Sequence, residues 1–139
     1  MKYVLDASVG LKTVLPETLS DKATALIREF QKQVHELIAP DTYLVECAHA
    51  LTRAERKGLI QPREGEDKFT LISDTCPDLI PHLPLLARAF QISSVMRHGV
   101  YDCLYLALAE QEQCELVTAD LRLVSALGSK FPIVSLDSL

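Results

Sequence analysis

Short apolar segments alternate with longer amphipathic segments along this chain, and that alternation restricts its fold more than any other feature. The apolar segments, typical of buried strands, lie at 2–6, 37–40, 78–83, 116–118 and 133–135. Helical patterns occupy 9–15, 20–30, 41–57, 62–72, 85–97, 101–113 and 121–127. Strands that alternate with helices are joined by right-handed crossovers into a mainly parallel sheet. The sequence therefore predicts an α/β fold.

A single domain is the expected organisation. The chain has 139 residues, which is a typical domain length. It shows no internal repeat, no low-complexity tract and no Gly/Ser-rich linker. We therefore expect one domain that covers residues 1–139.

Composition excludes several classes of protein. A content of 48% hydrophobic and 24% charged residues is unlike that of a disordered chain, and the longest apolar stretch, 103–109, is too short to span a bilayer. The net charge of −5 excludes a broadly basic nucleic-acid binder, but not a nucleic-acid enzyme that holds a metal ion. The four cysteines form no C-x-x-C pair, and the first residues do not resemble a secretory signal. We expect reduced thiols and a cytoplasmic protein.

Four acids occupy positions where such folds place their chemistry. Asp6 and Asp120 each directly follow a predicted strand, and ligands of parallel sheets bind at the carboxyl ends of the strands. Asp102 lies in the first turn of a helix that is apolar almost all round, so an ionised carboxylate there requires compensation. Glu46 shares the polar side of its helix with His49 and Arg53.

Each acid also has a purely structural explanation. Asp6, Asp102 and Asp120 are suitable helix N-caps, and Glu46 is explained as a solvated residue balanced by His49 or Arg53. Taken together, however, carboxylates that meet at one sheet edge repel each other by about 3 kcal/mol per pair, at about 5 Å and an effective dielectric constant of about 20. A hard divalent cation such as Mg²⁺ or Mn²⁺ relieves that repulsion. Without these four acids the formal net charge would change from −5 to −1.

Four segments of the chain resemble those of PIN-domain proteins, and most of all those of VapC-type toxin ribonucleases. They are VLDAS at 4–8, AP at 39–40 leading to VECA at 45–48, YDCLYLALAE at 101–110 and LVTADLRL at 116–123. They occur in the order that the family shows and extend over almost the whole chain. The resemblance implies a three-layer α/β/α fold with a central parallel sheet and metal-dependent endonucleolytic cleavage of RNA.

The same resemblance assigns roles to individual residues. Asp6, Glu46, Asp102 and Asp120 match the acidic positions that bind Mg²⁺ or Mn²⁺, and the hydroxyls of Ser8 and Thr118 match positions that support the site. It also implies a small antitoxin partner that covers the site, and a homodimer. Residues that lie near the motifs and are candidates for contacts with RNA phosphates are Lys12, Arg53, Arg97, His98 and Arg122.

Other functions fit the sequence less well. A haloacid-dehalogenase-type phosphatase requires a second Asp two places after the first, where this chain has Ser8, and a response-regulator receiver requires an acidic pair after its first strand. The five glycines form no phosphate-binding loop. The alternative that stays open is a catalytically silent binding protein with the PIN fold, whose acids serve only as caps.

Overall fold

The strands form a parallel sheet in the order β3-β2-β1-β4-β5. A computed structural model describes residues 1–15 and 18–139. In the centre of the sheet, Val4 lies opposite Ile38 on one side and Leu116 on the other. The strands are β1 (Lys2–Leu5), β2 (Glu36–Pro40), β3 (Asp78–Ile80), β4 (Glu115–Thr118) and β5 (Ile133–Ser135). The expected parallel sheet is therefore confirmed.

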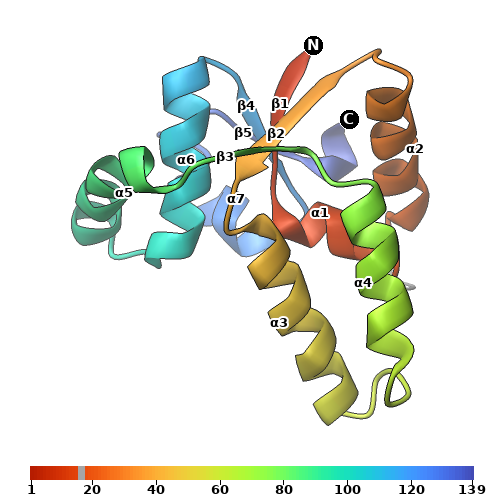
Figure 1. Cartoon of the computed structure of the whole chain (residues 1–139). Helices are drawn as coiled ribbons and strands as arrows, with labels where there is room; N and C mark the ends of the chain where they lie inside the picture. The colour runs from red at the N-terminus through yellow and green to blue at the C-terminus, as the bar shows by residue number, and fades with distance from the viewer. Residues whose placement is uncertain (16–17) are drawn as a thin grey trace.

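Helices cover both faces of the sheet, which gives the expected three layers. Helix α6 contacts β1, β2 and β4, and α5 packs against α6. Helices α2 and α4 lie on the other side, and α3 and α4 project together from the body (Figure 1). The helices are α1 (Ala7–Lys12), α2 (Ser20–Gln31), α3 (Tyr43–Arg56), α4 (Glu64–Asp74), α5 (Leu83–Met96), α6 (Val100–Glu112) and α7 (Leu121–Leu127), followed by the 3-10 helix η1 (Leu136–Ser138).

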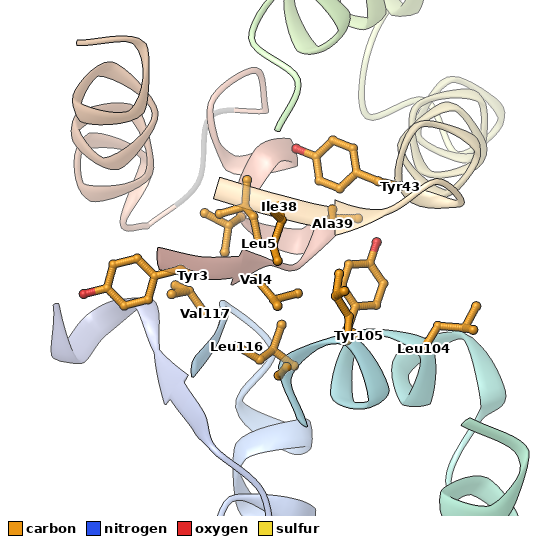
Figure 2. Packing of buried hydrophobic residues seen from close by; sticks show 14 of the residues in the cluster. Tyr3, Val4, Leu5, Ile38, Ala39, Tyr43, Leu104, Tyr105, Leu116 and Val117 are labelled. Atoms are coloured by element: carbon orange, nitrogen blue, oxygen red, sulfur yellow. The ribbon is translucent and has the colours of Figure 1, made fainter. Parts of the chain in front are cut away.

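The core lies between the central strands and α6. Val4, Leu5 and Leu116 are fully buried, and Figure 2 shows Val4 of β1 and Leu116 of β4 beside Tyr105 of α6. All residues of α6 from Cys103 to Ala109 are buried, because this helix is enclosed by the sheet on one side and by α5 on the other. Burying each large apolar side chain contributes about 1.5–3 kcal/mol. The apolar surface of α6 is thus explained by its packing. Asp102, in the first turn of α6, is therefore carried by a helix that is fixed in the core.

Helix boundaries depart from the sequence prediction at the first helix. It begins at Ala7 and ends at Lys12, whereas the pattern predicts 9–15. The start is earlier because Asp6 already occupies the N-cap position with extended backbone. The end is earlier because the hydroxyl and N–H of Thr13 both donate to the carbonyl of Gly10, which closes the last turn. This compact turn holds Ser8 close to the end of β1.

The structure also describes the four cysteines and the length of the helices. Cys47, Cys76, Cys103 and Cys114 are free thiols. Within the two described ranges, none of the helices combines the length and the apolar character that crossing a bilayer requires.

Candidate metal centre

Asp6 is a buried carboxylate at the carboxyl end of β1. Its Oδ2 accepts hydrogen bonds from the Ser8 hydroxyl at 2.5 Å and the Thr118 hydroxyl at 2.9 Å. Although Asp6 occupies the N-cap position of α1, its side chain makes no capping hydrogen bond. Burial raises the pKa of Asp6 to about 6, the hydroxyls oppose that rise, and the negative charges of Asp102 and Asp120 add to it. Capping therefore does not explain this residue.

The two hydroxyls that hold Asp6 are themselves held by backbone amides. The N–H of Ala119 donates to Ser8 Oγ at 3.0 Å, and the N–H of Asp120 donates to Thr118 Oγ1, also at 3.0 Å. Each hydroxyl has one proton, which goes to Asp6, and lone pairs that accept from the amide. Ser8 and Thr118 thus join the end of β1 to the loop after β4. Their position beside Asp6 agrees with the supporting role that the sequence predicts.

Asp120 serves as a helix cap and remains close to Asp6. Its Oδ1 accepts hydrogen bonds from the N–H of Arg122 at 3.0 Å and of Leu123 at 3.4 Å, at the start of α7. The capping interpretation of the sequence is therefore correct for Asp120. It does not exclude a second role, since both bonds use one oxygen and the charge of Asp120 still raises the pKa of Asp6.

Glu46 points from α3 toward α6 and does not pair with His49 or Arg53. Its Oε2 accepts hydrogen bonds from the Tyr105 hydroxyl at 2.6 Å and from the Thr42 hydroxyl at 3.3 Å. Burial raises the pKa of Glu46 to about 7, and the charges of Asp6 and Asp102 add to the rise, whereas the Tyr105 hydrogen bond lowers it.

Tyr105 is a site residue that the sequence analysis missed. It is fully buried in α6, one turn after Asp102, and its hydroxyl holds Glu46. A buried Tyr in an otherwise apolar helix needs a partner for its hydroxyl, and this requirement is the one sequence signal that identifies it.

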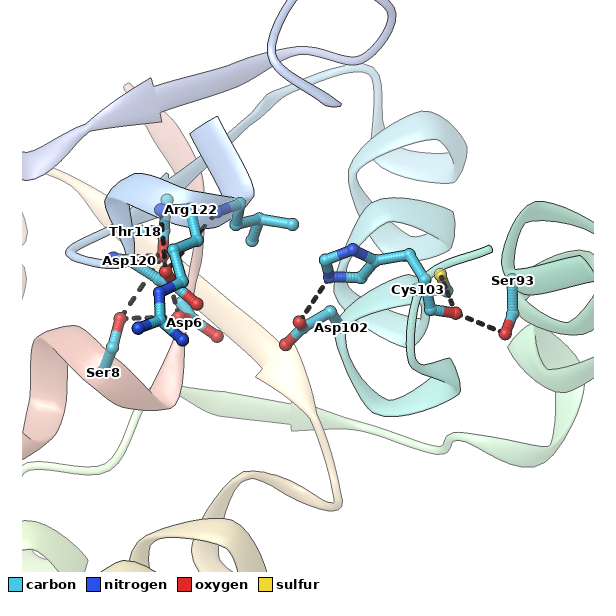
Figure 3. A network of polar contacts seen from close by, with 10 residues as sticks. Asp6, Ser8, Ser93, Asp102, Cys103, Thr118, Asp120 and Arg122 are labelled. Carbon is cyan, nitrogen blue, oxygen red and sulfur yellow. Dashed lines mark hydrogen bonds and ion pairs between the residues drawn. The ribbon is translucent and has the colours of Figure 1, made fainter. Parts of the chain in front are cut away.

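Asp102 faces the other acids from the first turn of α6. Figure 3 shows Asp6, Ser8, Thr118 and Asp120 gathered on one side, with Asp102 across from them. Its Oδ2 lies 2.7 Å from Nε2 of His98, a residue in the turn before α6. The side chain is one-third exposed, so Asp102 closes the group on its solvent side.

The donor set suits a hard divalent cation, although the side chains are not arranged as a finished ligand shell. Carboxylate oxygens are the donors that Mg²⁺ and Mn²⁺ prefer. Burial raises the pKa values of Asp6 and Glu46, the charges of neighbouring acids add to the rise, and a divalent ion relieves that added repulsion. Across residues 1–15 and 18–139, no three Asp, Glu, His or Cys side chains lie so as to hold an ion. Each carboxylate instead binds a neighbouring hydroxyl, amide or imidazole.

Comparison with known proteins decides the family. The family model described as PIN domain matches residues 3–127. The chain belongs to the PIN domain family. Among curated relatives of this PIN-domain chain, "Ribonuclease VapC3" of Pyrobaculum aerophilum is 32% identical over 136 residues, which cover 95% of this chain and 96% of the relative. "VapC ribonuclease Mb0985" of Mycobacterium bovis is 30% identical over 130 residues, which cover 94% of each chain.

Solved structures share the PIN-domain architecture at low sequence identity. The crystal structure of PAE2754 from Pyrobaculum aerophilum superposes with a TM-score of 0.72 at 18% identity, over 99% of this chain and 94% of the other. VapBC2 from Rickettsia felis, bound to a DNA fragment from the VapBC2 promoter, superposes with a TM-score of 0.69 at 12% identity, over 97% of this chain and 98% of the other. The fold of the PIN domain is therefore confirmed from structure as well as from sequence.

The basic residues predicted to contact substrate differ in their exposure. Arg122 is exposed in the first turn of α7, two residues after Asp120. Arg53 is exposed on α3, two turns after Glu46, and Arg97 is exposed in the turn between α5 and α6. Lys12, at the end of α1, is half-buried.

Proposed function

We propose that this PIN-domain chain is a divalent-metal-dependent endoribonuclease and the toxin of a type II toxin–antitoxin pair. The observation that carries the proposal is the set of four acids at the carboxyl edge of a PIN-domain sheet, where burial raises the pKa of Asp6 and of Glu46 and the charges of neighbouring acids add to the rise. Curated relatives that cover nearly the whole chain are named ribonucleases. A catalytically silent binding protein that uses its acids only as caps does not explain Asp6, whose side chain makes no capping hydrogen bond.

The roles of the acids follow from the hydrogen bonds that already fix them. Asp6 is the central ligand, because the hydroxyls of Ser8 and Thr118 fix its Oδ2. Asp120 would ligate through the oxygen that does not cap α7. When bound, Mg²⁺ or Mn²⁺ supplies Lewis-acid activation of the scissile phosphate and of an attacking water.

Glu46 and Asp102 complete the site from the other side. Tyr105 and Thr42 both donate to Oε2 of Glu46, so Oε1 would be the oxygen that binds an ion or a water. Asp102 approaches from the start of α6, and its side chain is one-third exposed. We assign both residues as ligands, either direct or through a water that they orient.

RNA cleavage in the presence and absence of a divalent ion tests this function. The purified chain is expected to cleave single-stranded RNA with Mg²⁺ or Mn²⁺, and to lose that activity when EDTA is added, because the four carboxylates alone repel the phosphate. Restoring Mn²⁺ in excess over EDTA should restore cleavage, which controls for damage to the protein. RNA that remains intact with either ion, while the chain still binds it, would instead identify a silent binding protein.

Substrate binding is expected to depend on Arg53. Arg53→Ala should weaken binding of a labelled single-stranded RNA, and should make the slope of log affinity against log salt shallower by about 0.7, the value for one phosphate contact on a single strand. Fluorescence anisotropy over a series of salt concentrations measures both. Arg28→Ala removes the same charge from an exposed position of α2, a helix that contributes none of the four acids, and serves as the matched control. Equal slopes for the two variants would contradict the assignment of Arg53 as a phosphate contact. We propose the same role for Lys12, Arg97 and Arg122.

The proposed partner is a small antitoxin protein. The superposed VapBC2 structure and a toxin–antitoxin complex from Klebsiella pneumoniae, with a TM-score of 0.59, combine this fold with such partners. We further propose a homodimer and a cytoplasmic location, where RNA and antitoxin are available. The exposed apolar side chains of α5, Leu83 and Phe90, support an interface with a second copy.

A further inference from the structure

His98 lies against a candidate metal ligand in an arrangement that the cleavage reaction does not by itself require. Its Nε2 is 2.7 Å from Oδ2 of Asp102, four residues later in the chain, and both side chains are mostly buried. A carboxylate only accepts hydrogen bonds, so Nε2 carries the proton and donates it to Oδ2. The bond engages one oxygen of Asp102 (Figure 3).

The backbone of His98 is fixed on both sides of the residue. Its N–H donates to the carbonyl of Ser93 at 3.2 Å. Its carbonyl accepts from the Ser93 hydroxyl at 2.5 Å and from the Cys103 thiol at 3.9 Å. Arg97, just before it, ends α5 in the left-handed conformation, with φ of 55°. These hydrogen bonds fix the main chain of His98 in the turn between α5 and α6, and so restrict where its imidazole can lie.

From these contacts we infer that His98 is a positioning residue, which holds Asp102 so that Oδ1 faces the ion held by the other acids. This inference rests on the proposed metal site. Carboxylates that bind metals are themselves oriented by hydrogen bonds, and loss of such a partner lowers metal affinity about 10- to 100-fold. His98 thereby reduces the freedom of an acid whose side chain is one-third exposed.

The competing explanation is that His98 only helps α6 to begin. Gly99 is the N-cap of α6 and makes no side-chain capping bond, so a polar residue beside it has structural value. That explanation predicts a loss of stability without a change in metal affinity. Metal binding, measured separately from stability and from cleavage, distinguishes the two.

The test compares His98→Gln with His98→Asn by calorimetric titration of EDTA-treated protein with Mn²⁺. Glutamine places an N–H near the position of Nε2, whereas the amide of asparagine is too short to reach it. We expect His98→Asn to weaken Mn²⁺ binding about 10- to 100-fold and His98→Gln to stay within about threefold of wild type. His82→Asn is the matched control, because Nδ1 of His82 lies at the same 2.7 Å from the carboxylate of Asp41, which is not among the four acids.

The outcomes separate this inference from the proposed function. Suppose that Asp102→Asn weakens Mn²⁺ binding. If His98→Asn does not weaken it, or if His98→Gln weakens it as much as His98→Asn, the role of His98 is overturned and the metal site stands. If Asp102→Asn also leaves Mn²⁺ binding unchanged, both are overturned. Thermal unfolding without metal, recorded for each variant, verifies that the titrated protein is folded, and the glutamine variant keeps the comparison valid if asparagine is not tolerated.

Discussion

Asp6→Asn is expected to abolish RNA cleavage and, at the same time, to stabilise the metal-free protein. The variant loses the central carboxylate, so we expect its cleavage rate to fall by at least about 100-fold. Stability should rise because ionised Asp6 is buried near Asp102 and Asp120, which raises its pKa from 3.8 to about 6. At about 1.4 kcal/mol per pKa unit, ionising Asp6 in the folded protein costs up to about 3 kcal/mol of stability at neutral pH. The gain in the variant is smaller than this, because the Ser8 and Thr118 hydroxyls bind an amide more weakly than a carboxylate.

Cleavage assays in Mn²⁺ and urea unfolding in EDTA measure the two effects on the same preparations. Asp21→Asn, at an exposed position of α2, removes the same charge away from the site and should change neither quantity appreciably. A metal-free Asp6→Asn protein that is less stable than wild type would mean that Asp6 is held for structural reasons. Undiminished cleavage would remove it from the site.

The stability of the metal-free protein is expected to fall as pH rises, and a divalent ion is expected to reverse that fall. In metal-free protein, Asp6 and Glu46 have pKa values of about 6 and about 7 in place of the ordinary 3.8 and 4.5. Between about pH 4 and pH 7 the native state therefore binds more protons than the unfolded state, and stability falls as pH rises through that range. A divalent ion should reverse the loss at pH 7.5, and should have little effect at pH 5, where protons already neutralise these carboxylates.

Thermal unfolding with EDTA or with Mn²⁺ at the two pH values measures this linkage. Mn²⁺ at about 100 times its Kd should add about 2.7 kcal/mol, which corresponds to several degrees in Tm. In Glu46→Gln and Asp6→Asn the pH dependence of the metal-free protein should be flatter. Equal stabilisation by Mn²⁺ at pH 5 and pH 7.5 would contradict the assignment of these two acids.

The fold and the positions of the acids within it were predictable because they depend on local sequence. The apolar segment at 2–6 indicates a buried strand, and in parallel sheets the residue after a strand lies at the ligand-binding edge, which is where Asp6 and Asp120 lie. Asp102 was identifiable because an ionised carboxylate at the start of the apolar helix at 101–113 requires compensation.

Periodicity does not predict the partners that come from segments far apart in the chain, and only the family resemblance pointed to Ser8 and Thr118. Tyr105 and Glu46 are 59 residues apart, and Thr118 and Asp6 are 112 apart. Which polar group meets which acid depends on the packing of α6 against α3 and on strand register, neither of which periodicity determines. The first helix boundary failed for a related reason, since Thr13 closes the turn by a side-chain bond that the apolar pattern does not show.

Helix α6 carries Asp102 and Tyr105 in its first two turns and is buried from Cys103 to Ala109. Natural variation at the buried positions of α6 is therefore limited for two reasons. The side chains must fit the core, and the helix must place Asp102 and, through Tyr105, Glu46. Under the proposed function, a new RNA preference is expected to evolve through exposed positions such as Arg53 on α3, which lies outside the buried stretch of α6.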